Sequence, residues 1–395
     1  MSIFYKADLI ITNDGPPITN GIVEVNEEGV IVSVFQDDAF QDYKFVESIL
    51  IPGLVNAHCH LELSHLENKI SPRHNGMAGF IDQIFSQRDN SDFQECTNAM
   101  LLQDQKMFEE GIVAVGDISN SAVSIEVKKN SRIHYHTFVE VMGMSAASAQ
   151  SRFDNGVSLV NQFVQNNLTN VSLALHAPYS ISKKLLQLVN EHLKNNSASS
   201  IHINESNDEL LFCKSKSGPL KEVFEKYKLP VNDFDNISDE SVLIDCVQQL
   251  NNASPFILVH NVKTTTSEIE IANSMRAILY WCLCVNANKY ITNEVPDLTN
   301  YLNDSLRVVI GTDSLASNHQ LSVWEELKTI SQLNNQIPFE QLIKWATING
   351  ACALSLQNKI GKIKPGYAPG LVQVLNVNVN APSITNDSYT RRVVS

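Results

Sequence analysis

Two histidines separated by one residue are the first feature of this sequence that could do metal chemistry. His58 and His60 follow the apolar segment IPGLVNA, which is typical of a buried strand. Residues two apart in an extended chain point to the same side, so both imidazoles face one spot. Imidazole nitrogens bind divalent transition metals, so the pair predicts part of a metal site. Taken alone, the two histidines could equally be unrelated surface residues.

Further histidines and an aspartate follow other apolar runs. They are His176 after LAL, His202 within SIHINES, His260 after FILV and Asp313 after VVIGT. A single residue of this kind could be a hydrogen-bonded polar group of a core. A whole series at strand ends is hard to explain as packing, because burying unpaired polar groups costs free energy. The pattern therefore predicts a metal site assembled from several strand ends.

The elements that must position these residues recur through the middle of the chain. Candidate strands lie at residues 49–56, 112–118, 134–141, 171–176, 200–204, 256–260, 277–285 and 307–311. Helix-like segments between them lie at residues 79–88, 95–110, 157–166, 183–195, 242–251, 266–275 and 296–303. Eight strand-then-helix units predict an α/β fold, a (β/α)₈ TIM barrel, whose active site lies at the carboxyl ends of its strands.

The two ends of the chain carry β-type patterns without helices. Apolar runs at residues 7–12, 21–26 and 30–35 are separated by turn residues, and residues 371–379 follow a stretch rich in Gly and Pro. We expect a small composite β-sandwich domain built from residues 1–50 and 360–395. The metal-dependent barrel, residues 51–359, would be inserted between these two parts.

Composition and charge exclude several classes of function. The 395 residues are 43% hydrophobic and 18% charged, which suits a globular protein with a large core. A net charge of −14 repels phosphate, so we expect a small-molecule substrate, with no nucleic acid and no membrane as partner. Seven scattered cysteines and no recognisable signal peptide favour a cytoplasmic location. A homodimer is compatible with the sequence.

Eight segments carry a specific resemblance that spans nearly the whole chain. They are PGLVNAHCH, EEGIVAVGD, LHAPYSIS, HINES, CVNANKYI, GTDSLASN, ATINGACAL and IGKIKPGYAPGLV. Together they resemble the amidohydrolase superfamily and, within it, the cytosine-deaminase-like aminohydrolases, adenosine-type deaminases and chlorohydrolases. Three places depart from the family pattern. Val113 stands where threonine is usual, and VNAN at residues 285–288 replaces a Pro-x-Ser-Asn sequence. The return strand has APGL at residues 368–371, where an Ala-Asp pair is usual.

The resemblance implies the ligands of the metal. His58, His60, His202 and Asp313 would hold one divalent ion. The lysine that bridges a second ion in binuclear relatives has no counterpart at the end of the fourth barrel strand. Three nitrogens and a carboxylate suit Zn²⁺ first, with Fe²⁺ as the alternative.

The resemblance also implies a hydrolytic mechanism. A divalent metal lowers the pKa of its bound water from 15.7 to about 7 and so supplies hydroxide. Asp313 would accept a proton from this water, and Glu205 would protonate a ring nitrogen and then the departing ammonia. His260 would touch the water or the substrate and stabilise the oxyanion. His176 and Asn288 would lie near the substrate.

The segment after the first two histidines bears on the substrate. HLELSHL and GFIDQIFSQRD resemble the aminodeoxyfutalosine deaminases more than the guanine or thioadenosine deaminases. Glu62 is a candidate substrate ligand, with a purely structural carboxylate as the alternative, and Arg88 is expected at a solvated helix end. The implied activity is hydrolysis of a carbon–nitrogen bond other than a peptide bond. It would deaminate a purine-like ring of adenine-nucleoside type, aminodeoxyfutalosine being one example.

Two alternatives remain open at this point. The first is an amidohydrolase or chlorohydrolase that acts on a cyclic amide or a halogenated N-heterocycle, which product analysis would distinguish. The second is a non-catalytic binding protein on the same scaffold, because one fold supports many functions. Bound metal would distinguish an enzyme from that binding protein.

Overall fold

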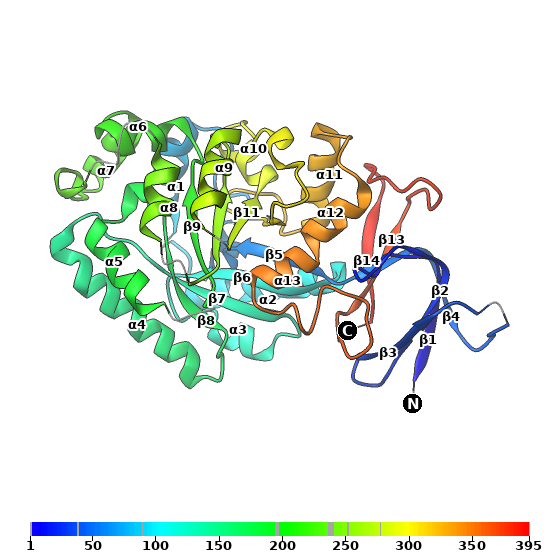
Figure 1. Ribbon diagram of the computed structural model, residues 1–395. Coiled ribbons are helices and arrows are strands. Elements are labelled where there is room, and N and C mark those ends of the chain that lie inside the picture. Colours follow the sequence, from blue (N-terminus) through cyan, green and yellow to red (C-terminus); the bar gives the residue numbers. More distant parts are fainter. Residues whose placement is uncertain are drawn as a thin grey trace.

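The chain was analysed as a computed structural model, which describes residues 2–37, 39–88, 90–193, 197–235, 241–250, 253–276 and 278–394. Strands and helices alternate through the middle of the chain, and a separate sheet lies at one end of the molecule (Figure 1). Both termini lie at that sheet. Among the described helices, none is both long enough and apolar enough to cross a bilayer.

Eight parallel strands form the central layer. The first sheet contains β5 (Leu54–Cys59), β6 (Ile112–Ser119), β7 (His134–Val141) and β8 (Val171–Leu175), and the second contains β9 (Ser199–Ile203), β10 (Phe256–His260), β11 (Leu279–Leu283) and β12 (Val308–Ile310). Each strand pairs in parallel with the next one along the chain within its sheet. This order is the one expected for a (β/α)₈ barrel.

Backbone hydrogen bonds join the two sheets at both junctions. Between β12 and β5, the amides of Thr312 and Asp313 donate to the carbonyl of His58 at 2.9 and 3.2 Å. Between β9 and β8, the amide of His202 donates to the carbonyl of His176 at 2.9 Å. The eight strands thus follow one another around the predicted TIM barrel.

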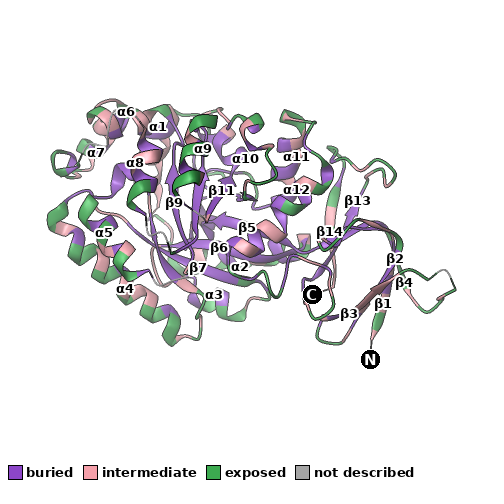
Figure 2. Ribbon diagram, in the orientation of Figure 1, coloured by how far each residue is buried: buried purple, intermediate pink, exposed green. Residues whose placement is uncertain are grey.

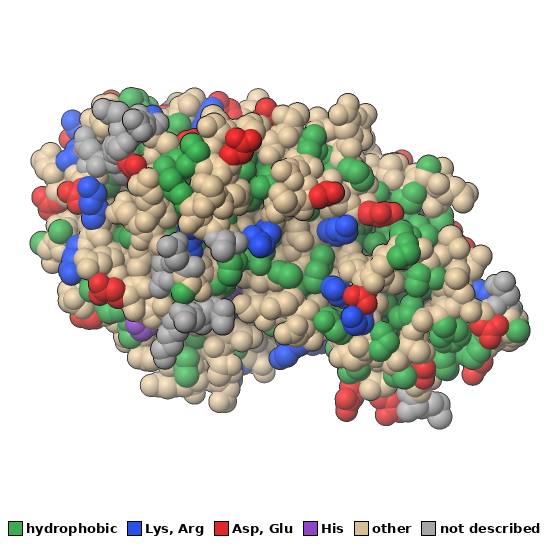
Figure 3. Space-filling model, viewed as in Figure 1, with side chains coloured by type: hydrophobic (Ala, Val, Ile, Leu, Met, Phe, Trp, Pro, Cys, Tyr) green, Lys and Arg blue, Asp and Glu red, His purple; other side chains and the backbone are tan. Residues whose placement is uncertain are grey.

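The barrel strands are buried along almost their whole length. All residues of β5, β6, β9, β10 and β11 are buried, whereas the surrounding helices expose their outer faces (Figure 2). Burial on both faces explains why these strands appear in the sequence as continuous apolar runs. On the face shown in Figure 3, acidic and basic side chains lie among polar and apolar ones.

Thirteen α-helices are found among the described residues. They are α1 (Gly76–Gln87), α2 (Phe93–Glu110), α3 (Ile125–Asn130), α4 (Ala149–Gln165), α5 (Lys183–His192), α6 (Asn207–Ser215), α7 (Pro219–Lys226), α8 (Val242–Gln249), α9 (Thr266–Met275), α10 (Val285–Ile291), α11 (Val323–Leu333), α12 (Phe339–Ala346) and α13 (Ile348–Ala353). Helix α1 lies between β5 and α2 and packs against α6 and α7. It is therefore an addition to the barrel repeat.

The two ends of the chain share one six-stranded sheet. Its order is β14-β13-β4-β1-β2-β3, with β1 (Ile3–Ile10), β2 (Ile18–Val25), β3 (Ile31–Phe35), β4 (Lys44–Pro52), β13 (Leu371–Leu375) and β14 (Tyr389–Val394). Apolar side chains from β1 to β4 and from β13 form one cluster. The predicted composite β domain thus takes the form of one continuous sheet.

The structure differs from the predicted elements at several places. Residues 49–56 were predicted to be one strand, but β4 ends at Pro52 and β5 begins at Leu54. The second half of β4 and all of β5 are buried, so the apolar pattern shows no break at Gly53. Residues 296–303 form only a short 3₁₀ turn, Leu298–Tyr301, and β14 was not predicted. The predicted element ends at residues 195, 251 and 277 lie outside the described residues.

Gly53 offers a test of this junction between the terminal sheet and the barrel. A Cβ atom there would lie 2.5 Å from the carbonyl oxygen of Pro369 and would overlap the side chain of Val113. We expect Gly53→Ala to lower the free energy of unfolding by about 1–3 kcal/mol through overpacking, measured by urea denaturation. Gly15→Ala is the matched control, because nothing lies within 4 Å of its added Cβ. Equal stability of the two variants would contradict this account.

Candidate active site

The ends of the first and last barrel strands bring three predicted metal ligands together. The Nε2 atoms of His58 and His60 lie 3.2 Å apart. The Oδ1 atom of Asp313 lies 3.5 Å from the first nitrogen and 3.2 Å from the second. All three residues are buried. Two ring nitrogens and a carboxylate oxygen thus converge on one small region.

His202 joins this cluster from the end of β9. Its Nδ1 atom donates to the carbonyl oxygen of His176 at 2.7 Å, which leaves the Nε2 lone pair free. Atoms of His58, His202, His260 and Asp313 all lie within 4.8 Å of one another. A backbone acceptor on the outer nitrogen is the usual way in which a protein orients a metal-binding histidine.

The donor set fits a divalent cation. Burial lowers the pKa of His58, and burial together with the neighbouring histidines holds the pKa of His202 well below its ordinary value. Burial opposes ionisation of Asp313, but hydrogen bonds from His58 and His60 outweigh it and hold its pKa well below the usual range. His60 differs, because burial lowers its pKa but the hydrogen bond and negative charge of Asp313 outweigh burial and raise it. Metal binds the neutral ring, so a bound cation would displace the proton that Asp313 favours on His60.

His260 differs from the other histidines in its hydrogen bonds. The side-chain amide of Asn288 donates to its Nδ1 atom at 3.0 Å, so the hydrogen resides on Nε2. That Nε2 atom lies 3.5 Å from the Oε1 atom of Glu205. Burial lowers the pKa of His260 to about 3, which keeps the ring neutral. His260 is therefore placed as a hydrogen-bond donor rather than as a metal ligand.

Two of the site residues have strained backbones. His260 has a φ of +77° and Asp313 a φ of +58°. Residues other than glycine rarely adopt this region of backbone conformation. The hydroxyl of Ser317 donates to Oδ2 of Asp313 and leaves Oδ1 directed at the histidines. Such strain persists only where surrounding structure enforces it, and it concentrates at functional sites.

Glu205 follows β9 and lies at the same end of the cavity. Its backbone amide donates to Oε2 of Glu209 at 2.7 Å, which fixes the start of the loop that carries it. Burial raises the pKa of Glu205 well above its usual range, and the negative charges of Asp313 and Glu209 add to this effect. Glu205 is thus suited to hold a proton at neutral pH and to release it to a bound ligand.

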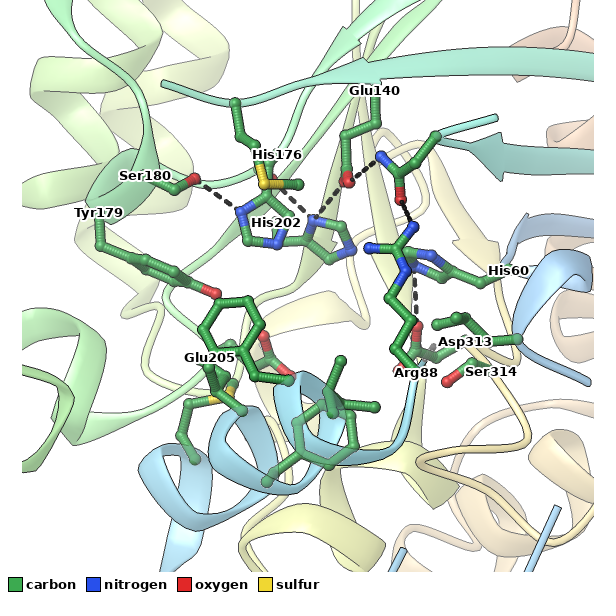
Figure 4. A pocket seen from close by; sticks show the side chains of 18 of the residues that line it. His60, Arg88, Glu140, His176, Tyr179, Ser180, His202, Glu205, Asp313 and Ser314 are labelled. Atoms are coloured by element: carbon green, nitrogen blue, oxygen red, sulfur yellow. Dashed lines mark hydrogen bonds and ion pairs between the residues drawn. The ribbon is translucent and has the colours of Figure 1, made fainter. Parts of the chain in front are cut away.

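A cavity of about 160 Å³ opens beside these residues. Figure 4 shows His60, His176, His202, Glu205 and Asp313 around it. The apolar part of the lining, called the apolar wall below, consists of Met77, Phe80, Ile81, Ile84, Phe85, Met142, Met144, Tyr179, Phe224 and Leu229. An apolar cavity with polar groups at one end is typical of a small-molecule site.

The remaining predicted residues lie at different depths. His176 lines the cavity, and its Nδ1 atom lies 2.6 Å from the hydroxyl of Ser180. Glu62 lies behind the wall and accepts hydrogen bonds from the amide of Asn120 at 2.7 Å and from the hydroxyl of Ser121 at 3.0 Å. Asn288 contacts His260, as described above. The structure thus places Glu62 and Asn288 beside residues that line the cavity.

Sequence reasoning missed a polar strip on one wall of the cavity. Arg88 lies at the end of α1, as expected, with its side chain 35% exposed, but it also lines the cavity, and its Nη2 atom donates to Oδ1 of Asn120 at 3.2 Å. Asn120 in turn donates to Oε2 of Glu140 at 2.9 Å. A signal for Glu140 was available, since it is the only carboxylate in the buried run YHTFVEV.

A buried ion pair supports the segment that contains His58 and His60. Nζ of Lys128 lies 2.6 Å from Oδ2 of Asp117, and both side chains are fully buried. The other carboxylate oxygen of Asp117 accepts the backbone amide of Leu61 at 2.7 Å, directly after His60. This pair therefore supports the backbone that presents His58 and His60.

We expect Lys128→Met to lower the free energy of unfolding by about 3–5 kcal/mol, because Asp117 would remain buried without its partner. Urea denaturation measures this loss. The exposed pair of Lys129 with Glu126 provides the control, and Lys129→Met should cost at most about 1 kcal/mol. Adding Asp117→Asn to Lys128→Met should restore part of the stability, since it removes the unpaired charge. A double variant no more stable than Lys128→Met would contradict this explanation.

Comparison with known proteins gives consistent matches. The amidohydrolase family matches residues 49–395. An adenosine deaminase of Helicobacter pylori is 25% identical over 80% of this chain and 76% of its own length. An aminodeoxyfutalosine deaminase of Nitratiruptor is 26% identical over 71% of this chain and 67% of its own length.

A solved structure extends this likeness to the fold. The crystal structure of Helicobacter pylori aminofutalosine deaminase in complex with methylthio-coformycin superposes with a TM-score of 0.81. The alignment covers 99% of this chain and 100% of that chain, at 20% sequence identity. The barrel and the terminal sheet thus match a known architecture over their full length.

Proposed function

The chain belongs to the amidohydrolase family and is a hydrolase of carbon–nitrogen bonds, and we propose that it deaminates an adenine-type nucleoside, with release of ammonia. The observation that carries the proposal is Glu205, which lines the cavity with its Oε1 atom 3.5 Å from Nε2 of His260. Two curated relatives named as deaminases of adenine-containing compounds support it. Substituted nucleosides such as aminodeoxyfutalosine fall within this class.

His58, His60, His202 and Asp313 would hold one divalent metal ion, for which Zn²⁺ is our first choice. A bound ion of this kind supplies a water molecule of lowered pKa at neutral pH. Fe²⁺ is the alternative, because imidazole nitrogens and a carboxylate suit both metals.

Asp313, Glu205 and His260 have separate roles in the rest of the proposed reaction. Ionised Asp313 accepts a proton from the attacking water, since hydrogen bonds on its other oxygen keep Oδ1 directed inward. Protonated Glu205 donates to a ring nitrogen, which makes the adjacent carbon electrophilic, and its proton can later reach the departing ammonia. The Nε2 hydrogen of His260 stabilises the oxygen that gains negative charge.

The apolar wall suits the flat ring of the proposed substrate. Phe80, Ile84 and Met144 are among the residues that line the cavity. Apolar contact with a purine ring excludes water from the reacting carbon, and it strengthens the hydrogen bonds of Glu205 and His260. In this proposal the polar residues carry out the hydrolysis, and the apolar wall binds the ring of the substrate.

Metal content tests the ligand assignment. We expect the purified wild-type protein to contain close to one equivalent of zinc or iron, and His58→Ala to lose it together with all turnover. Glu205→Gln should retain the metal, because Glu205 belongs to the proton pathway only. Plasma emission spectrometry on chelator-free preparations measures both variants. Full metal occupancy in His58→Ala would remove that residue from the ligand set.

A substrate panel tests the reaction itself. The metal-loaded protein is incubated with adenine, adenosine, 5′-deoxyadenosine and methylthioadenosine, and ammonia release is followed together with the ultraviolet change of the ring. We expect turnover of at least one nucleoside and a loss of about 100-fold or more in Glu205→Gln. Absence of ammonia from every aminopurine would refute the deaminase proposal, as would an undiminished rate in Glu205→Gln.

A further inference from the structure

Glu140, near the end of β7, is one of the residues that line the cavity, and one oxygen of its buried carboxylate has no hydrogen-bond partner among the described residues. The residue is only 8% exposed, and the oxygen concerned is Oε1. Leaving a buried carboxylate oxygen without a donor costs free energy, so such atoms are rare unless a ligand completes them. The mechanism proposed above does not use Glu140.

The polar strip holds this carboxylate in place through its other oxygen. Oε2 accepts from the side-chain amide of Asn120, which itself accepts from Arg88. Arg88 also lies 3.6 Å from Oε1 of Glu62, so its charge is already shared with another carboxylate. Arg88 thus pairs directly with Glu62 and reaches Glu140 through the neutral amide of Asn120. The carboxylate of Glu140 therefore favours ligand groups that donate hydrogen bonds over anionic groups.

The histidines nearest to Glu140 do not provide the missing donor. Nδ1 of His202 lies 3.8 Å from Oε1, but its hydrogen is directed to the carbonyl of His176 at 2.7 Å. Atoms of Glu140, His176 and His202 lie within 4.8 Å of one another, which could suggest a second cation. That nitrogen of His202 carries a hydrogen, however, and has no lone pair for a metal. A donor group of the substrate fits better.

We propose that Glu140 accepts hydrogen bonds from the sugar hydroxyls of the nucleoside and selects substrates that carry a ribosyl diol. This inference rests on the proposed deaminase function. Figure 4 shows Glu140 and Glu205 on opposite sides of His202. A purine carries its amine and its sugar on different rings, so a ring whose amine lies near Glu205 directs its sugar away from that end. Ribosyl hydroxyls are neutral donors, as the strip requires.

The test compares adenosine with 2′,3′-dideoxyadenosine in the wild type and in Glu140→Gln. We expect the wild type to favour adenosine by about 10- to 100-fold in kcat/KM, the usual effect of a hydrogen bond to a charged group. In Glu140→Gln this preference should fall toward unity, through a higher KM for adenosine with little change in kcat. The dideoxy compound should react with both proteins at similar rates. Glu191→Gln, on an exposed face of α5, is the matched carboxylate-to-amide control.

Metal content is measured on the same samples, because Glu140 lies near His202. An unchanged preference in Glu140→Gln would overturn the proposal, as would a wild type that does not discriminate between the two nucleosides. Loss of metal from Glu140→Gln, with equal loss of activity on both nucleosides, would also overturn it and would make Glu140 a support of the metal site. A wild type that deaminates no aminopurine would refute the proposed function, and this inference would fall with it.

Discussion

The hydrogen-bonded seam between the first and last barrel strands is the constraint on which the site depends. The amides of Thr312 and Asp313 both donate to the carbonyl of His58, and the side chain of Asn56 bonds to the hydroxyl of Thr312 at 2.7 Å. These residues lie more than 250 positions apart in the sequence, as the separation of 256 between Asn56 and Thr312 shows. Closure of the barrel thus creates the convergence of His58, His60 and Asp313, which no local segment could produce. A change that opens this seam removes fold and chemistry together.

Buried carboxylates fix the backbone of the loops that follow the strands. Asp117 accepts the amide of Leu61, and Glu209 accepts the amide of Glu205. Each bond fixes a backbone atom next to a residue of the site, and so it limits how far the neighbouring side chain can move. Burying a carboxylate is costly, and Lys128 offsets that cost for Asp117 with a direct ion pair. Position is therefore maintained by polar groups that never touch the substrate.

The features that could be predicted from the sequence are those that produce a pattern within a short segment of it. His58 and His60 are recognisable because alternation in a strand places both on one side, and Asp313 stands out after an apolar run. The break at Gly53 left no signal, because the second half of β4 and all of β5 are buried and appear as one apolar stretch. Glu140 and Arg88 were missed for a different reason. Asn120, which follows β6, connects the two side chains, and spacing along the chain does not encode these contacts.

His202 belongs to the cluster of candidate metal ligands and also lies beside Glu140, whose Oε1 atom is 3.8 Å from its Nδ1 atom. Its Nδ1 atom is committed to the backbone carbonyl of His176, and this carbonyl remains whichever side chain occupies that position. The ring orientation of His202 is therefore insensitive to most substitutions around Glu140. Helix α1, an addition to the barrel repeat, supplies half of the ten residues of the apolar wall, and Arg88 lies next to its end. Because the candidate metal ligands lie at the ends of barrel strands and half of the wall comes from this added helix, substitutions in the helix can alter the wall without altering the ligands.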